Sequence, residues 1–247
     1  MPTYFLSISY KGTRYAGFQV QDNALTIQGE VERVMEVYLQ EPVKLTGSSR
    51  TDAGVHAHNN YFHFQIGRQL DKKILYNLNA MLPSDIALTG LEEMREGAHC
   101  RFEATSRRYH YYIYNKKDPF LADRAWFVPY PLAYDLMNEA AGLLIGRHDF
   151  TSFAKRNTQV ANHFCTVLTC QWEEIDGLWK FSVEGNRFLR GMVRGLVGTM
   201  VKIGREKMSI DEFSEVLKAK DNTMADFTAP AHGLFLEKVV FPYDLGL

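Results

Sequence analysis

Cysteine and net charge are both scarce in this chain of 247 residues. It contains three cysteines, Cys100, Cys165 and Cys170, and no two of them form a Cys-x-x-Cys pair. This odd, widely spaced set argues against a disulfide framework and favours a reducing compartment, the cytoplasm. The formal net charge is −1, so any nucleic acid must be bound by a local basic groove rather than by a bulk positive field.

Several patterns that define large enzyme classes are also absent. The chain has no phosphate-binding loop, no Gly-x-Gly-x-x-Gly motif and no Gly-x-Ser-x-Gly motif, which argues against P-loop, dinucleotide-binding and α/β-hydrolase enzymes. It has no repeat and no linker rich in Pro, Gly or Ser. The stretch from Met1 to Tyr10 has no basic leader and only a short apolar run, so we expect neither a signal peptide nor a membrane-spanning segment.

The chain does contain enough apolar material for a full core, since 46% of its residues are hydrophobic and 13% are aromatic. Alternating apolar residues predict a strand over 4–10, and an apolar stripe at helical spacing predicts a helix over 27–40. The Asp-Gly pair at 176–177 predicts a hairpin turn between strands at 163–174 and 178–184. The pattern is therefore that of a packed protein with both helices and strands.

Each half of the chain runs through a similar order of strand, helix, strands, helix and strand. Strands joined by hairpins, with few helices between them, favour an α+β fold with a mostly antiparallel sheet. We therefore predict two ferredoxin-like halves, 1–105 and 106–247, that form one extended sheet flanked by helices, with an active-site cleft between the halves.

The segment 47–58 differs from both halves around it because it has neither an apolar run nor any periodicity. In an extended segment, residues two apart share a side, so the Arg50 guanidinium could keep the Asp52 carboxylate ionised and aimed. Gly54 would allow a sharp turn, and His56 adds a second polar group. The segment could be no more than a turn, but a turn has no need of an arginine and two histidines around one carboxylate. We interpret Asp52 as a nucleophile or as an anchor for a cation.

Two further segments combine basic residues with apolar ones. The aromatic segment 107–112 could stack a base and hold phosphates, although its pattern favours a sheet strand with buried rings. The segment 188–203 is predicted to be a helix, with Arg187, Arg190 and Arg194 along one side as either a solvated face or a phosphate groove. Arg194 lies among apolar residues and would need a carboxylate if buried, for which Asp52 is a natural candidate.

Histidines offer two alternative sites. His56, His58 and His63 suggest a zinc-dependent hydrolase, but no cysteine or compact set of acids completes the site, so we predict no metal. His148 and Asp149 could form an acid–base pair, although the neighbouring phenylalanines favour a packed loop. A glycosidase would need a second acid near Asp52, and no sequence feature singles one out.

Taken together, these segments resemble the tRNA pseudouridine synthase A family. The segment 50–56, Arg-Thr-Asp-Ala-Gly-Val-His, matches the catalytic motif of that family, Arg-Thr-Asp-x-Gly-Val-His. The segments 108–111 and 192–198 resemble its second and third motifs. The resemblance covers nearly the whole chain, with further matches at 10–19, 79–86, 148–153 and 233–236.

The resemblance implies a role for each matching residue. Asp52 would be the nucleophile, Tyr109 would pack on the target base, and Arg194 would pair with the aspartate. Arg50 belongs to the same motif as Asp52 and would shape the cleft. We also expect a wider set of polar residues to contact RNA: Arg14, Gln19, His56, Arg107, Arg108, Arg187 and Arg190.

The resemblance also implies a reaction. Members of the family isomerise uridine to pseudouridine in the anticodon stem-loop of tRNA, at positions 38, 39 or 40, as homodimers and without a metal or organic cofactor. Lys11 and Phe18 depart from the usual family pattern. These departures leave room for an alternative, a non-catalytic tRNA-binding chaperone on the same fold, against which the intact Asp52, Tyr109 and Arg194 argue.

Overall fold

The computed structural model describes residues 1–156 and 160–245. The chain divides into two compact units. Unit 1 consists of Met1–Thr105 together with the segment from Leu236 onward, and unit 2 consists of Ser106–Phe235. Both units combine helices with mostly antiparallel strands, which confirms the predicted α+β class.

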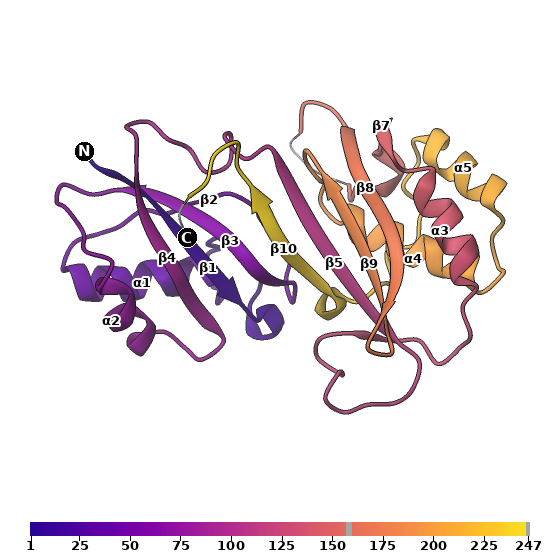
Figure 1. Cartoon of the computed structure of the whole chain (residues 1–247), viewed down its shortest axis with the longest axis horizontal. Helices are drawn as coiled ribbons and strands as arrows, with labels where there is room; N and C mark the ends of the chain where they lie inside the picture. The colour runs from indigo at the N-terminus through magenta and orange to yellow at the C-terminus, as the bar shows by residue number, and fades with distance from the viewer. Residues whose placement is uncertain (157–159, 246–247) are drawn as a thin grey trace. The chain divides into compact units, whose positions relative to one another are not determined.

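Unit 1 contains a sheet whose strands lie in the order β4-β1-β3-β10, with β2 paired to β3 (Figure 1). Strand β1 is central and is buried along nearly its whole length. The predicted order of strand, helix, strands, helix and strand is confirmed in this unit. Its elements are β1 (Thr3–Tyr10), η1 (Gly12–Arg14), α1 (Ile27–Leu39), β2 (Thr46–Gly47), β3 (His56–Gln65), α2 (Ile74–Met81) and β4 (Ile86–Met94).

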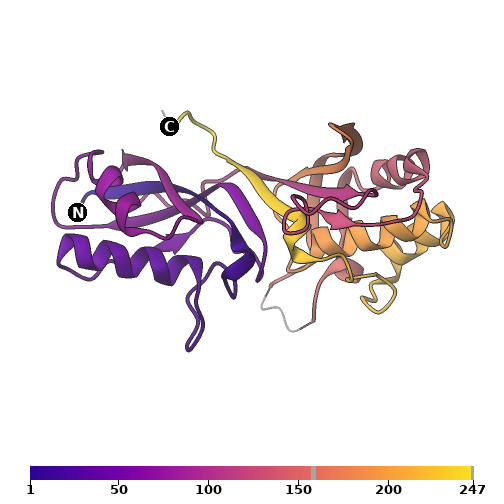
Figure 2. The same ribbon diagram turned by 90° about the horizontal axis from the view of Figure 1, so that it is seen from below.

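Helix α1 begins where the sequence predicts it. The side chain of Thr26 accepts a hydrogen bond from the backbone N–H of Gly29, which satisfies one of the donors left open in the first turn. Ile27, Val31 and Val34 then form its buried stripe. Figure 2 shows α1 running along one side of the strands of unit 1. The helix therefore covers one face of the sheet.

Unit 2 contains the strand order β5-β9-β8-β7, with the short strand β6 parallel to β5. Helix α3 packs against β8 and against α4, and α5 packs against α3. The elements of this unit are β5 (Ser106–Tyr114), β6 (Trp126–Phe127), α3 (Tyr134–Gly142), β7 (Gly146–Asp149), η2 (Thr151–Phe153), β8 (Phe164–Ile175), β9 (Leu178–Gly185), α4 (Met192–Gly204), α5 (Ile210–Ala219) and η3 (Ala231–Gly233).

The hairpin β8–β9 confirms the predicted turn. Asp176 and Gly177 have φ angles of 52° and 76°, the left-handed pair that a two-residue hairpin turn requires. Ile175 and Leu178 are partners across the turn, and the register continues unbroken from this pair to Thr169 and Glu184. The Asp-Gly signal was therefore sufficient to place this part of the sheet.

The C-terminal strand β10 (Leu234–Val240) begins in unit 2 and continues in unit 1 beside β3. We predicted a C-terminal half of 106–247, whereas the compact unit that starts at Ser106 ends at Phe235. The difference arises because β10 completes the sheet of the N-terminal unit. Positions 157–159 and 246–247 of the predicted half lie outside the described residues.

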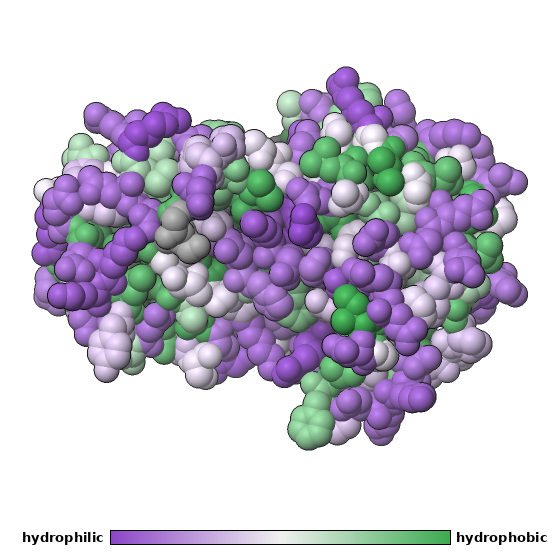
Figure 3. Space-filling view, viewed as in Figure 1, coloured by the Kyte–Doolittle hydropathy of each residue, from purple (hydrophilic) through white to green (hydrophobic). Residues whose placement is uncertain are grey.

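Other features of the chain bear on its class. All three cysteines are buried thiols and none forms a disulfide. Within the described residues, no helix has the length and apolar character needed to cross a membrane. On the face drawn in Figure 3, hydrophilic residues predominate and apolar ones occur in small groups. Among the described residues, no broad apolar patch is visible on this face.

Candidate active site

Asp52 lies in unit 1, on the loop between β2 and β3. The loop is shorter than predicted, because His56 to His58 already belong to β3. The N–H of Val55 donates to the carbonyl of Asp52 over 3.1 Å, which closes a tight turn directly after the acid. Gly54 has a φ angle of 79°, so this turn needs a residue without a side chain there. The Asp52 side chain itself is half-buried.

A neighbouring segment of unit 1, residues 12–18, fixes the loop on both sides of Asp52. The N–H of Phe18 donates to the carbonyl of Thr51 over 3.1 Å, immediately before the acid. The N–H of Gly54 donates to the carbonyl of Tyr15 over 3.3 Å, two residues after it. The backbone on each side of the carboxylate is thus held by another backbone segment, and segment 12–18 limits how far Asp52 can move.

Buried side chains reinforce this arrangement. The hydroxyls of Tyr10 and Thr51 are hydrogen-bonded at 2.8 Å, and the amide of Asn60 donates to the carbonyl of Ser49 over 2.9 Å. The ring of His56 is 1% exposed, and its Nδ1 accepts the N–H of Gly12 over 3.0 Å. We expected His56 to contact RNA; the structure instead gives its ring a supporting position beneath the loop.

Substitution of Gly12 tests how closely the backbone at Gly12 packs against the backbone at Val55. A Cβ atom at position 12 would lie 2.0 Å from the carbonyl oxygen of Val55. This contact is too short to form, and because the neighbouring atom belongs to the backbone, no side chain can rotate away to relieve it. We expect Gly12→Ala to lower the free energy of unfolding by roughly 1–3 kcal/mol, as overpacking does, and to lower activity with it. Gly142→Ala is the matched control, because a Cβ there meets nothing within 4 Å. Thermal unfolding of both variants tests this expectation, and equal melting temperatures would refute the close packing of Gly12 against Val55.

The polar residues predicted around Asp52 have different environments. Arg50 is exposed and has no ion-pair partner within the described ranges, so the predicted Arg50–Asp52 pair is not formed there. Arg14 is held by Asp85, with Nε 2.7 Å from the carboxylate. Gln19 is exposed and follows Phe18, whose ring stacks on Phe62 in the core. Contacts of Arg14 and Gln19 with RNA stay a prediction.

Tyr109 lies in unit 2 on β5, opposite Val183 of β9. Its side chain is 8% exposed, and the edge-to-face contact with Phe188 places the two ring centroids 5.0 Å apart. Burial alternates along the strand, so Tyr109 and Tyr111 share one face while Arg108 lies on the other. The rings are thus mostly core, as the pattern of this strand favoured.

Arg194 lies in the first turn of α4 and is half-buried. Its Nε donates to the carbonyl of Ala229 over 2.6 Å, which fixes the plane of the guanidinium. Burial raises the pKa of the Tyr111 phenol well above its usual value, and the nearby positive charge of Arg194 opposes that rise. The Tyr111 hydroxyl donates to the carbonyl of Pro230 over 2.8 Å, so β5, α4 and the segment before η3 converge here.

The prediction of an arginine stripe on one helix was wrong. Helix α4 begins at Met192, not at Phe188, because Gly191 has a left-handed φ of 75° that no right-handed helix allows. Arg187 and Arg190 therefore lie on the loop that precedes α4. On β5, an Arg107 Nη donates to the carbonyl of Asn186, and Arg108 pairs with the Glu184 carboxylate at 2.7 Å.

The histidines that suggested a zinc site, His56, His58 and His63, have separate hydrogen-bond partners. His58 pairs with the carboxylate of Glu237 at 2.9 Å, and this hydrogen bond raises its pKa. His63 lies 3.3 Å from the thiol of Cys100, and burial, with a further contribution from His99, lowers its pKa to about 4. Among the described residues there is no group of three or more His, Cys, Asp or Glu side chains that could hold a metal ion.

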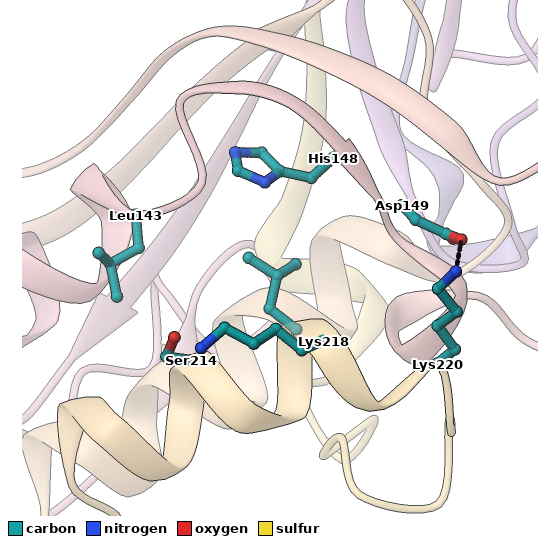
Figure 4. A pocket seen from close by; sticks show the side chains of 7 residues that line it. Leu143, His148, Asp149, Ser214, Lys218 and Lys220 are labelled. Carbon is teal, nitrogen blue, oxygen red and sulfur yellow. Dashed lines mark ion pairs between the residues drawn. The ribbon is translucent and has the colours of Figure 1, made fainter.

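His148 and Asp149 line a hollow of about 450 Å³ in unit 2, but they do not form an acid–base pair (Figure 4). The Asp149 carboxylate points to Lys220, with 3.2 Å between the charged atoms, and it also accepts two hydrogen bonds from Thr151. The Nε2 of His148 lies 3.0 Å from the carbonyl of Ile145. The packing that we favoured is confirmed by these contacts and by the complete burial of Phe150, but the predicted loop is wrong here, because both residues lie on β7.

Comparison with known proteins identifies a family model and relatives that match this chain. A family model described as tRNA pseudouridine synthase matches residues 140–242. The chain is 40% identical over 252 residues to tRNA pseudouridine synthase A of Porphyromonas gingivalis, with 100% of both chains covered. It is also 40% identical over 242 residues to tRNA pseudouridine synthase A of Geobacillus sp., with 95% and 96% covered. The chain belongs to the tRNA pseudouridine synthase A family.

Membership of the tRNA pseudouridine synthase A family confirms the predicted enzyme class, a tRNA pseudouridine synthase. A crystal structure of a Cbf5–Nop10–Gar1 complex aligns with 80% of this chain and 54% of its own, at a TM-score of 0.34 and 10% identity. A similarity this low bears on neither the fold nor the function.

Sequence reasoning missed the residues of this family member that hold the Asp52 loop. Tyr10 and Asn60 hold it through side chains, and Tyr15 and Phe18 hold it through backbone groups. A signal was present, because the family motif at 10–19 contains two of these four residues, Tyr10 and Tyr15, and spans Phe18. The motif marked the segment as important, but it did not reveal that the segment brackets the acid.

Proposed function

We propose that this chain isomerises uridine to pseudouridine in the anticodon stem-loop of tRNA, at one or more of positions 38, 39 and 40. The observation that carries the proposal is the setting of Asp52. It is a half-buried carboxylate within the family's catalytic motif, on a turn whose backbone is held on both flanks. A nucleophile gains most when its geometry is fixed before the substrate arrives.

The reaction is redox-neutral. The bond between C1′ and the base nitrogen N1 breaks, the base rotates and a bond from C5 to C1′ forms. The proton on C5 is lost and the freed N1 takes up a proton, so substrate and product are isomers. Asp52 would act covalently at C1′ or at C6 of the base, or would promote elimination to a glycal. Each route needs an ionised carboxylate and a base that is held in place while it turns.

Tyr109 and Arg194 supply the remaining roles in the proposal. The target nucleotide must leave its stack to reach a loop carboxylate, and the ring of Tyr109 would replace the lost stacking. Arg194 would pair with Asp52 and keep it ionised. The fixed guanidinium plane of Arg194 supports this role, since an oriented donor loses less freedom when it pairs. Arg50, exposed two residues before the acid, would shape the substrate site around Asp52.

Other parts of the proposal rest on the family alone. We infer that the enzyme forms a homodimer in the cytoplasm, and that it needs no metal or organic cofactor. The remaining basic and polar residues would contact the RNA backbone, where neutralised phosphates release counterions. That set is Arg14, Gln19, Arg107, Arg108, Arg187 and Arg190, whereas the buried His56 would support the loop rather than contact RNA.

Mapping of pseudouridines in tRNA tests the proposal directly. Total tRNA from cells with and without this protein is compared nucleotide by nucleotide. The proposal expects pseudouridine to disappear from one or more of positions 38, 39 and 40, and to return when the wild-type chain is supplied. Loss of pseudouridine only outside the anticodon stem-loop would refute the assigned substrate region.

A substitution at Tyr109 separates stacking from the phenol hydroxyl. We expect Tyr109→Ala to lower kcat/KM roughly 10- to 100-fold, because base–aromatic stacking contributes about 1–3 kcal/mol per base. Tyr109→Phe keeps the ring and should stay within about threefold of wild type. Tyr112→Ala on the opposite face of β5 is the control for damage to the strand. If Tyr112→Ala lowers kcat/KM as much as Tyr109→Ala, the stacking role is wrong.

A further inference from the structure

Asp85 ties together the segment that brackets Asp52, although it belongs to a different part of unit 1. It lies directly before β4, and its side chain is 15% exposed. Its carboxylate accepts the hydroxyl of Tyr15 over 2.7 Å and pairs with Arg14 at 2.7 Å. Its backbone carbonyl accepts the N–H of Lys11 over 2.9 Å. One residue therefore receives donors from three positions of the segment 11–15.

Tyr15 connects this carboxylate to the active-site loop. Its side chain is 3% exposed, and burial together with the hydrogen bond to Asp85 raises its pKa to about 12. The phenol therefore stays protonated and donates throughout the neutral range. The backbone carbonyl of the same residue accepts the N–H of Gly54, in the turn that follows Asp52.

A second path runs through the start of the same segment. The N–H of Tyr15 donates to the carbonyl of Gly12 over 3.0 Å, and the N–H of Gly12 donates to Nδ1 of His56 over 3.0 Å. Tyr15 thus reaches the loop directly at Gly54, and through Gly12 it reaches His56, the first residue of β3 after the loop. Contacts at two separate points restrict the position and orientation of the loop, whereas a single contact would restrict only its distance from Tyr15.

We propose that Asp85 is a positioning residue for Asp52 and acts through the phenol and the backbone carbonyl of Tyr15. The inference rests on the proposed role of Asp52 as nucleophile. It also gives a role to the family motif at 79–86, which none of the site residues above explains. Without the hydrogen bond from the Tyr15 hydroxyl to Asp85, the backbone carbonyl of Tyr15 is no longer fixed in position, and the turn at Gly54 is held less tightly. The expected consequence is a misplaced carboxylate in a protein that still folds and still binds tRNA.

Tyr15→Phe is the sharpest variant, because it removes only the hydroxyl and leaves the pair between Arg14 and Asp85 intact. We expect kcat to fall about tenfold, since small misplacements of reacting groups cost rate rather than affinity, while KM for tRNA stays within about twofold. The melting temperature should stay close to that of wild type. Amide exchange in the peptide 50–56 should become roughly fivefold faster.

Two further variants show whether the effect passes through Asp85. Asp85→Ala should lower kcat about as much as Tyr15→Phe, and the double variant should be no slower than either single one, because both remove the same bond. Tyr243→Phe is the matched control. Its hydroxyl donates to the Glu103 carboxylate in the same unit, and its loss should leave kcat and exchange in 50–56 unchanged.

The outcomes separate this inference from the proposed function. Wild-type kcat in Tyr15→Phe, a rise in KM alone, or additive effects in the double variant would each overturn the positioning role while leaving Asp52 as nucleophile. If wild-type protein modifies no tRNA, the proposed function fails, and the exchange measurement still decides whether Tyr15 and Asp85 hold the loop. Unchanged exchange in both Tyr15→Phe and Asp85→Ala would sink the inference in either case.

Discussion

Asp52→Asn is expected to abolish the release of tritium from tRNA labelled at C5 of uridine, with a fall in rate on the order of 10⁴-fold or more. The amide has nearly the shape of the carboxylate, so the loop, held through backbone groups of Thr51 and Gly54, should keep its structure. What the amide lacks is the negative charge and the nucleophilic oxygen that each chemical route requires. The variant should therefore bind tRNA but leave the glycosidic bond intact.

A control and a contrary outcome complete this test. Asp211→Asn changes an exposed acid in the first turn of α5 and should release tritium at the wild-type rate. The Kd of Asp52→Asn for tRNA, measured by filter retention or by fluorescence, should stay within about threefold of the wild-type value. Full tritium release by Asp52→Asn would remove Asp52 from the mechanism and with it the assigned chemistry.

Arg194→Ala is expected to lower kcat/KM roughly 10²- to 10³-fold, because the proposed pair with Asp52 would lose its cation and removal of one member of a desolvated charge pair costs about 3–5 kcal/mol. Two properties of Arg194 favour a large effect. Its guanidinium is half-buried, and its Nε is committed to the carbonyl of Ala229, so the remaining nitrogens are presented in one orientation. Deletion of the side chain also leaves that carbonyl without this donor.

Arg194→Lys distinguishes charge from orientation. Lysine keeps the positive charge but cannot reproduce a planar fork held by the Ala229 carbonyl, so we expect an intermediate rate. Arg33→Ala, which breaks a surface ion pair with Glu30 on α1, is the control and should change little. The melting temperature of each variant is measured beside its kcat/KM, because Arg194 also lies near the buried Tyr111 and its loss could affect stability. Wild-type kcat/KM in Arg194→Ala would show that Asp52 needs no cation from this position.

Local signals in the sequence were sufficient for much of the fold. The Asp-Gly pair at 176–177 placed a hairpin because its φ angles follow from those two residues alone. Thr26 placed the start of α1 because capping involves only neighbouring residues. The same kind of reasoning failed at α4, where the basic and apolar pattern continued past Gly191 although the backbone there is left-handed.

The candidate site was predictable in its residues but not in its construction. The matched motif drew attention to Asp52, Tyr109 and Arg194, but it did not reveal how the loop around Asp52 is held. The support of Asp52 depends on backbone hydrogen bonds from Tyr15 and Phe18, residues far away in sequence. Backbone groups are the same in every residue, so no side-chain pattern could have identified those partners.

A structure of the protein with a bound tRNA anticodon stem-loop tests the central claim most directly. The account predicts one uridine turned out of its stack, with its base against the ring of Tyr109 and its C1′ or C6 within reach of the Asp52 carboxylate. It also predicts that Arg194 contacts that carboxylate. A complex in which Asp52 and Tyr109 contact different nucleotides, or in which the uridine remains stacked in the RNA, would contradict it.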